Sequence, residues 1–108
     1  MSQTSDRRMT RMIEQDVPIF AFPDAARWNA AADAVEFPVE LGEYRGTVRV
    51  GRAVFRRLLG HAATPESCLA AYHLERTRFE RAAEEKIRRR ELTADGNIEL
   101  NGRDLRRP

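Results

Sequence analysis

The strongest pattern in the sequence is a regular alternation of apolar and polar residues over residues 35–50, interrupted only at Gly42 and Glu43. A period of two is typical of β-strands that bury one face, and glycine at the first position of a two-residue loop favours a type II′ turn. We therefore predict a β-hairpin in which Leu41 lies opposite Tyr44. The other pairs on its apolar face are then Val39 with Gly46, Phe37 with Val48, and Val35 with Val50.

The polar face of this hairpin carries charges of opposite sign at facing positions. The predicted register sets Glu36 opposite Arg49 and Glu40 opposite Arg45. Each such cross-strand pair contributes about 0.2–1 kcal/mol. Pro38 has no backbone N–H to donate, so its nitrogen should face a sheet edge or a bulge. One register thus accounts for both faces of the hairpin.

Two segments precede the hairpin. The apolar run VPIFAF, at residues 17–22, is rich in strand formers and is closed by Pro23, which predicts a strand. The alanine-rich residues 24–34 predict a short helical turn opened by Asp24. Trp28 in this segment is expected to cover one end of the sheet.

After the hairpin, the spacing of apolar residues changes to that of helices. Residues 51–60 predict a short helix closed by the final glycine, because glycine suits the left-handed position after a helix. Thr64 as N-cap and Pro65 at the first helical position then open one long helix, which should run to about Arg89 or Arg90. Its apolar stripe consists of Leu69, Tyr72, Phe79, Ala83 and Ile87.

The C-terminal residues predict a second hairpin followed by a tail. Residues 92–100 have apolar side chains that fall on one face when residues 95–97 form the loop. Asn101 and Gly102 then turn the chain again, and the remaining RDLRRP predicts a frayed end.

Taken together, these elements predict a single α+β domain. A chain of 108 residues is long enough to bury one modest core. We expect a small antiparallel sheet packed against one long C-terminal helix, with a short helix and a C-terminal hairpin. The domain should span residues 16–105, between a flexible N-terminal arm at residues 1–15 and a frayed tail at residues 106–108.

Composition and charge limit the classes of function. The net charge is only +2, although 18 of the 19 basic residues are arginine, so any basic function must come from a local patch. No apolar run is long enough to span a membrane. The start of the chain has no apolar segment typical of a secretion signal, and Cys68 is the only cysteine. We therefore expect a cytoplasmic protein without membrane partners.

The basic segment EEKIRRRE, at residues 84–91, has two interpretations. Glutamates that precede arginines by four residues, as in Glu84 with Arg88 and Glu85 with Arg89, form ion pairs along one helix face. In this interpretation the segment is a paired helix end that leaves over only Lys86 and Arg90. In the other, the C-terminal tail returns beside the helix end and a basic patch binds phosphates of nucleic acid. Its members would be Lys86, Arg88, Arg89, Arg90, Arg106 and Arg107.

The sequence offers little catalytic chemistry. His61 and His73 are the only histidines, and no metal-binding spacing, glycine-rich phosphate loop or serine nucleophile motif is present. We expect no cofactor and no enzymatic activity. Thiol chemistry at Cys68 is the one exception to weigh, since a helix N-terminus lowers a thiol pKa and His61 lies in a nearby loop.

Three segments together are similar to a known family. They are FPDAARWNAAADAVEFPVELGEYRGTVRV, the short helix VFRRLLG, and LAAYHLERTRFERAAEEKIRRRELTADGNIELNGRDL. In this order they resemble the uncharacterised bacterial family called domain of unknown function 1488, over about residues 17–105. The resemblance implies a small α+β fold with a few antiparallel strands on one long helix. It supplies no activity and no catalytic residues.

Three hypotheses of function follow from the sequence. The first is a non-enzymatic interaction module that binds a protein partner or associates with itself, because edge strands of a small sheet can pair. The second is an accessory protein that binds nucleic acid through the basic patch. The third is a thiol-dependent enzyme or sensor at Cys68.

Overall fold

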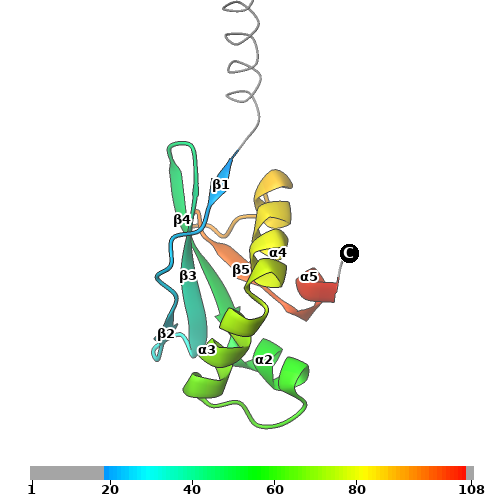
Figure 1. The fold of residues 1–108 in the computed structure, drawn as a ribbon. Coiled ribbons are helices and arrows are strands. Elements are labelled where there is room, and N and C mark those ends of the chain that lie inside the picture. Colours follow the sequence, from blue (N-terminus) through cyan, green and yellow to red (C-terminus); the bar gives the residue numbers. More distant parts are fainter. Residues whose placement is uncertain (1–18, 107–108) are drawn as a thin grey trace, which may run out of the picture.

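Two long strands, β3 (Ala34–Leu41) and β4 (Tyr44–Gly51), form the centre of the fold in the computed structural model, which describes residues 19–106 (Figure 1). They pair antiparallel in the predicted register along their whole length. Gly42 has a φ of 60°, and Glu43 has no positive φ, as a type II′ turn requires. The predicted hairpin is therefore confirmed in register and in turn.

Three short strands complete the sheet. These are β1 (Phe20–Ala21), β2 (Arg27–Asn29) and β5 (Ile98–Leu100). Both β1 and β2 pair antiparallel with β3, at its two ends, whereas β5 pairs parallel with β4. The sheet is thus mixed, and the expectation of a purely antiparallel sheet is wrong in this detail.

Pro38 lies between the parts of β3 that pair with β1 and with β2. The backbone N–H of Thr47, which is the partner of Pro38 on β4, donates to the Asn97 side chain instead of to β3. The nitrogen of Pro38 therefore faces away from β4, at an interruption of the neighbouring strands. This agrees with the prediction of an edge position.

The helical turn predicted for residues 24–34 is wrong, because this segment contains β2. Alanine-rich composition favours a helix, but the pairing of Trp28 with Val35 fixes an extended conformation here. Trp28 packs against the core from β2, and the Arg52 guanidinium lies 5.1 Å from its ring centroid.

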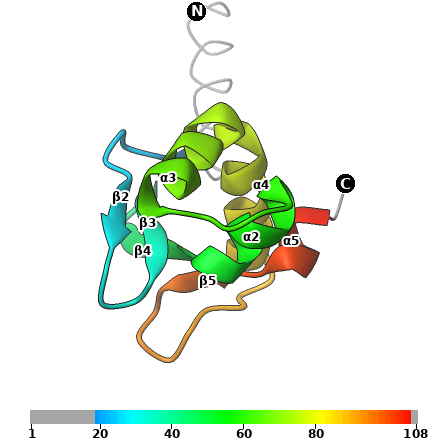
Figure 2. The ribbon, with the colours of Figure 1, turned by 90° about the horizontal axis from the view of Figure 1, so that it is seen from below.

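Helices cover one face of the sheet (Figure 2). They are α2 (Arg52–Leu59), α3 (Pro65–Leu74), α4 (Arg76–Arg88) and α5 (Gly102–Arg106). Gly60 closes α2 with a φ of 74°, and Thr64 caps α3 by accepting from the backbone N–H of Ser67, both as predicted.

The single long helix expected from the sequence is broken at Glu75, where φ is −118° and ψ is 35°. The break falls in the gap of the apolar stripe between Tyr72 and Phe79. It lets α3 pack on β3 while α4 packs on β5. The rings of Tyr72 and Phe79 still meet across the break, with centroids 5.6 Å apart. The predicted long helix is therefore two shorter helices, each of which packs on a different strand.

The C-terminal hairpin is also not formed. Residues 92–97 are a loop in which the Thr93 hydroxyl accepts from the backbone N–H of Asn97. Within the tail that was expected to fray, residues 102–106 form α5. Asn101 and Asp104 bond reciprocally, each side chain accepting from the other's backbone N–H, which caps this helix. The predicted arm at residues 1–15 and the last two residues lie outside the described range.

The core lies between the sheet and the helices. Its largest fully buried side chains are Tyr72, Phe37, Phe55, Phe79, Ile98, Val35, Val39, Val48, Val50 and Cys68. The predicted apolar faces of the hairpin and of the helices therefore meet in one cluster. Among the residues described, no helix has the length and apolar character needed to cross a membrane.

Candidate functional site

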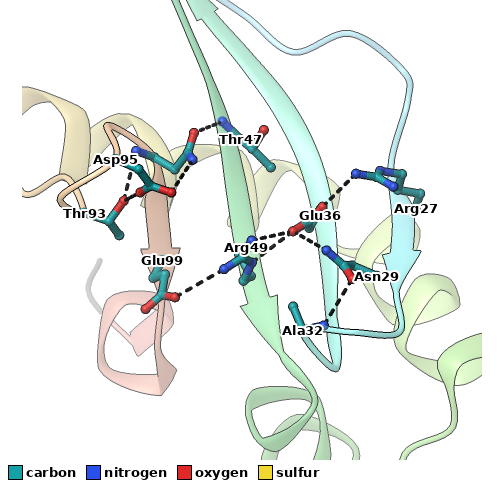
Figure 3. A network of polar contacts seen from close by, with 10 residues as sticks. Arg27, Asn29, Ala32, Glu36, Thr47, Arg49, Thr93, Asp95 and Glu99 are labelled. Carbon is teal, nitrogen blue, oxygen red and sulfur yellow. Dashed lines mark hydrogen bonds and ion pairs between the residues drawn. The ribbon is translucent and has the colours of Figure 1, made fainter.

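The open face of the sheet carries a polar network centred on Glu36 (Figure 3). Although it lies on this face, Glu36 is only 4% exposed. Its Oε1 accepts from Arg27 at 3.1 Å, and its Oε2 accepts from Asn29 and from Arg49, each at 2.9 Å. Arg49 also lies 3.8 Å from Glu99 on β5. The network therefore connects strands β2, β3, β4 and β5.

The electrostatics of Glu36 follow from these contacts. Burial by itself raises the pKa of this carboxyl, but the hydrogen bonds from Asn29 and Arg49 and the charges of Arg49 and Arg27 outweigh burial. The pKa of Glu36 is therefore lowered from its usual value of 4.5. Both oxygens accept hydrogen bonds from neighbouring strands, and the lowered pKa makes this carboxylate a weaker base, so it is suited to holding the strands together.

Sequence reasoning found one half of this network. The hairpin register predicted Glu36 beside Arg49, and the structure confirms an ion pair there. It missed Arg27 and Asn29, because both lie in the segment that was expected to be helical. Their alternation with Trp28 was the only signal of a strand, and three residues are too few to reveal a period.

The end of α4 shows where the predicted nucleic-acid residues lie. Arg88 pairs with Glu84 at 3.6 Å and Arg89 pairs with Glu85 at 3.1 Å, as the four-residue spacing predicted. Arg88 also lies over the Phe20 ring, 5.3 Å from its centroid. The positive charges of Arg88 and Arg89 are therefore largely compensated by glutamates of the same helix.

Lys86 and Arg90 were expected to be left over, and for Lys86 this is wrong. Its ammonium lies 3.2 Å from the carboxylate of Asp104, which is only 8% exposed, and donates to the backbone oxygen of Glu99 at 3.1 Å. A buried carboxylate is stable when a cation and hydrogen bonds accompany it. Arg90 is exposed, with a φ of 59°, and ends the helix.

The C-terminal helix returns beside α4, but it runs away from the arginines at the end of α4. Asp104 contacts Lys86 near the end of α4, whereas the Leu105 carbonyl accepts from Arg78, near its start. Arg106 is thereby placed on the side of α2 and not beside Arg88–Arg90. Arg107 lies outside the described residues. Whether the six predicted residues bind nucleic acid stays a prediction.

Arg106 instead approaches Arg57 of α2. A Cβ atom placed on Gly102 would lie 3.5 Å from Nη1 of Arg106 and 3.7 Å from Nη1 of Arg57. Two further exposed arginines, Arg56 and Arg103, belong to the same two helices. We call Arg56, Arg57, Arg103 and Arg106 the α2–α5 arginine surface. Over residues 19–106, none of these four side chains forms an ion pair.

This surface was not predicted from the sequence. Arg56 and Arg57 appeared as the polar side of a short helix, and Arg103 as part of a frayed end. One signal was present in the sequence: α2 contains no acidic residue, and none lies three or four positions from Arg56 or Arg57, where it could form an ion pair along the helix. Only the folding of α5 brings the two helices together.

The titratable groups suspected of chemistry differ in exposure, and within the described residues they form no hydrogen bond with one another. Cys68 is fully buried, and burial raises the pKa of its thiol, although the nearby Arg52 charge opposes this rise. His61 is exposed in the loop after α2, with Nδ1 2.8 Å from the carbonyl oxygen of Ala62. His73 is exposed on α3, with its ring packed edge-on to Tyr72. Within the described residues, no group of histidine, cysteine and carboxylate side chains could hold a metal ion.

Fold and surface together define a class of small α+β proteins, in which a mixed five-stranded sheet built on one long hairpin is covered by helices on one face. The chain belongs to the family DUF1488, described as proteins of unknown function, whose model matches residues 20–100. The predicted family resemblance is confirmed.

One solved structure of this family shares the fold. It is the crystal structure of a protein of unknown function from the DUF1488 family of Shewanella loihica PV-4. The two chains are 19% identical, with a TM-score of 0.71, and the match covers 76% of this chain and 91% of the other. A comparison with curated proteins found no match.

Proposed function

We propose that this protein is a non-catalytic interaction module that contacts an acidic macromolecule through the α2–α5 arginine surface. The observation that carries the proposal is the approach of Arg57 and Arg106 to each other from two helices that together carry four exposed arginines. Most arginines elsewhere in the described chain, such as Arg49, Arg76 and Arg89, are held by carboxylates. Unpaired cations gathered on one surface attract an acidic partner and increase its rate of association.

The edges of the sheet give less support to self-association. The outer edge of β3 is partly covered by β1 and β2, and Pro38 interrupts it in between. At the other edge, the Lys86 ammonium donates to the Glu99 carbonyl of β5. Short strands, proline and lysine are features that discourage strand pairing between molecules. Binding to an acidic partner is therefore a better supported form of the interaction hypothesis than self-association through sheet edges.

The burial of Cys68 supports a non-catalytic function. A reactive thiol needs access to its substrate and a lowered pKa, whereas this thiol is fully buried and its pKa is raised. The exposed His61 and His73 lie at the end of one helix and on the side of another, and within residues 19–106 neither is hydrogen-bonded to a carboxylate that would support it as a base.

Chromatography on immobilised heparin tests this function, because heparin is a generic polyanion. Arg57→Gln/Arg106→Gln should elute at clearly lower salt than the wild type. Arg88→Gln/Arg89→Gln is the matched control, since it removes the same net charge from ion-paired positions. It should elute close to the wild type.

Two results would count against the proposal. If the wild type does not bind heparin at low salt, the arginine surface does not attract polyanions. If both double variants shift elution equally, binding depends on net charge and not on this surface. A larger shift for the matched control would favour the end of α4, as the sequence hypothesis of a basic patch expects.

A further inference from the structure

A groove of about 800 Å³ runs along α4 and is lined by residues from the end of α3, from α4 and from α5. We call it the α4 groove. Two of its lining residues, Ala82 and Leu105, are apolar and buried, so the groove has an apolar floor. Exposed side chains such as Thr77 and Arg81 border this floor. A groove of this composition is suited to docking another protein surface.

An apolar side chain projects at one end of the α4 groove. Leu74 is the last residue of α3, directly before the break at Glu75, and it is 85% exposed. It is the most exposed of the large apolar side chains in residues 19–106. A single exposed leucine needs no explanation by itself, but this one borders a groove with an apolar floor. The same face therefore carries both an apolar projection and an apolar hollow.

The same face also carries an unpaired cation and an exposed carboxylate. Arg81 is exposed in the groove, and within the described residues it forms no ion pair. Glu75 is exposed as well, with an ion pair of 3.1 Å to Arg78. The guanidinium of Arg78 also donates to the carbonyl oxygen of Leu105 at 3.2 Å, so it is held by its own chain.

These features are arranged symmetrically about one residue. Glu75 and Arg81 lie three residues before and after Arg78, and Leu74 and Ala82 lie four residues before and after it. When two copies of a helix pack antiparallel about a two-fold axis, a residue before the axis meets the residue at the same distance after it. An axis near Arg78 therefore brings Leu74 onto Ala82 and Glu75 to Arg81, and each contact occurs twice.

We propose that the α4 groove binds the same groove of a second copy of this chain, in a two-fold dimer whose α4 helices lie antiparallel. Leu74 of each copy covers the apolar floor of the other groove, and Arg81 of each copy pairs with Glu75 of the partner subunit. A surface that is complementary to itself in shape and in charge about the same axis favours a second copy over an unrelated partner. The inference goes beyond the proposed function, because it uses other residues and does not depend on a polyanion.

Sedimentation equilibrium of the full chain, over micromolar to millimolar concentrations, tests the inference. The wild type should show an equilibrium between monomer and dimer. Leu74→Gln should weaken association at least about tenfold, because a symmetric dimer loses the apolar contact twice. Ile19→Gln is the matched control, since Ile19 is also a largely exposed apolar residue, at 70%, but does not line the groove. It should associate as the wild type does.

An exchange of charges tests the antiparallel arrangement. Arg81→Glu and Glu75→Arg each place like charges opposite one another, so each should weaken association severalfold. The double variant Glu75→Arg/Arg81→Glu should restore association close to that of the wild type, because opposite charges meet again. Residues six positions apart do not face each other along one helix, so this rescue reports a contact between two copies. Circular dichroism of each variant verifies that the fold is intact.

The results separate this inference from the proposed function. A wild type that stays monomeric at all concentrations would overturn the dimer, and heparin binding by that monomer would leave the proposed function in place. Equal weakening by Leu74→Gln and Ile19→Gln would overturn the assignment to the α4 groove. A double variant that associates no better than Arg81→Glu would overturn the antiparallel arrangement about Arg78.

Discussion

Arg49 on the sheet and Arg57 on α2 have different surroundings, although both reach the solvent. Arg49 is 41% exposed and donates to a carboxylate that is almost completely buried. Arg57 is exposed and faces another cation, Arg106, across Gly102. The Glu36 network and the α2–α5 arginine surface thus use the same residue type for two purposes.

This difference separates stability from binding. In the Glu36 network the arginines compensate a buried charge, so their removal should be felt in the free energy of unfolding. On the α2–α5 arginine surface they compensate nothing within the described chain, so their removal should be felt in the affinity for an anion. Exposure alone does not distinguish the two groups, whereas the position of the nearest carboxylate does.

The largest effect on stability is expected for Arg49→Met. This change leaves Glu36 buried, with Asn29 and the largely exposed Arg27 as its only partners among the described residues. Hydrogen bonds to a charged group contribute about 1.5–3 kcal/mol, so the free energy of unfolding should fall by about 2 kcal/mol. Unfolding in urea, followed by circular dichroism, measures it.

Arg45→Met is the matched control for this change. Arg45 lies on the same strand, opposite Glu40, but it is exposed and has no ion pair within the described residues. Its loss should change the free energy of unfolding by no more than about 0.5 kcal/mol. If Arg49→Met and Arg45→Met lowered the free energy of unfolding equally, the ion pair between Arg49 and the buried Glu36 would contribute nothing beyond the effect of an exposed arginine.

The pH dependence of stability sharpens the same comparison, with a smaller effect. The pKa of Glu36 is lowered in the folded state, so its contribution to stability is complete above about pH 4.5 and is lost as the pH falls through the lower folded value. The wild type should therefore be more stable than Glu36→Gln at pH 7, and this advantage should shrink below about pH 4.5. Urea unfolding at a series of pH values measures both proteins.

The α2–α5 arginine surface provides the contrast for this titration. Because its arginines pair with no carboxylate in residues 19–106, the difference between the wild type and Arg57→Gln/Arg106→Gln should not change over the same pH range. If the difference in the free energy of unfolding between the wild type and Glu36→Gln stayed constant down to pH 3, folding would not change the pKa of Glu36.

The parts of the fold that were predicted correctly from the sequence depend on residues that are close to one another in the sequence. The β3–β4 register follows from an alternation within one stretch of chain, and the ion pairs Arg88–Glu84 and Arg89–Glu85 follow from a spacing within one helix. The cap at Thr64 is equally local. Each of these signals is complete without knowledge of the remaining structure.

The features that were missed depend on residues distant in sequence. Strand β2 forms against its alanine-rich composition because it pairs with β3, and β5 pairs parallel with β4 after two helices intervene. Lys86 was assigned no partner because Asp104 lies on a helix that was itself not predicted. The approach of Arg106 to Arg57 has the same origin, so the α2–α5 arginine surface could not be derived from the chain alone.

The smallest expected effect is that the two double variants change the free energy of unfolding in opposite directions at low salt. Arg57→Gln/Arg106→Gln removes two like charges that approach each other, so it should raise the free energy of unfolding by about 0.3 kcal/mol. Arg88→Gln/Arg89→Gln removes two favourable ion pairs and should lower it by about 0.4–1 kcal/mol. Both differences should vanish in about 1 M salt, where the screening length falls to about 3 Å. Stabilisation in the first variant and destabilisation in the second, each abolished by salt, would show that the two groups of arginines differ in their electrostatic surroundings; a shared sign would show that they do not.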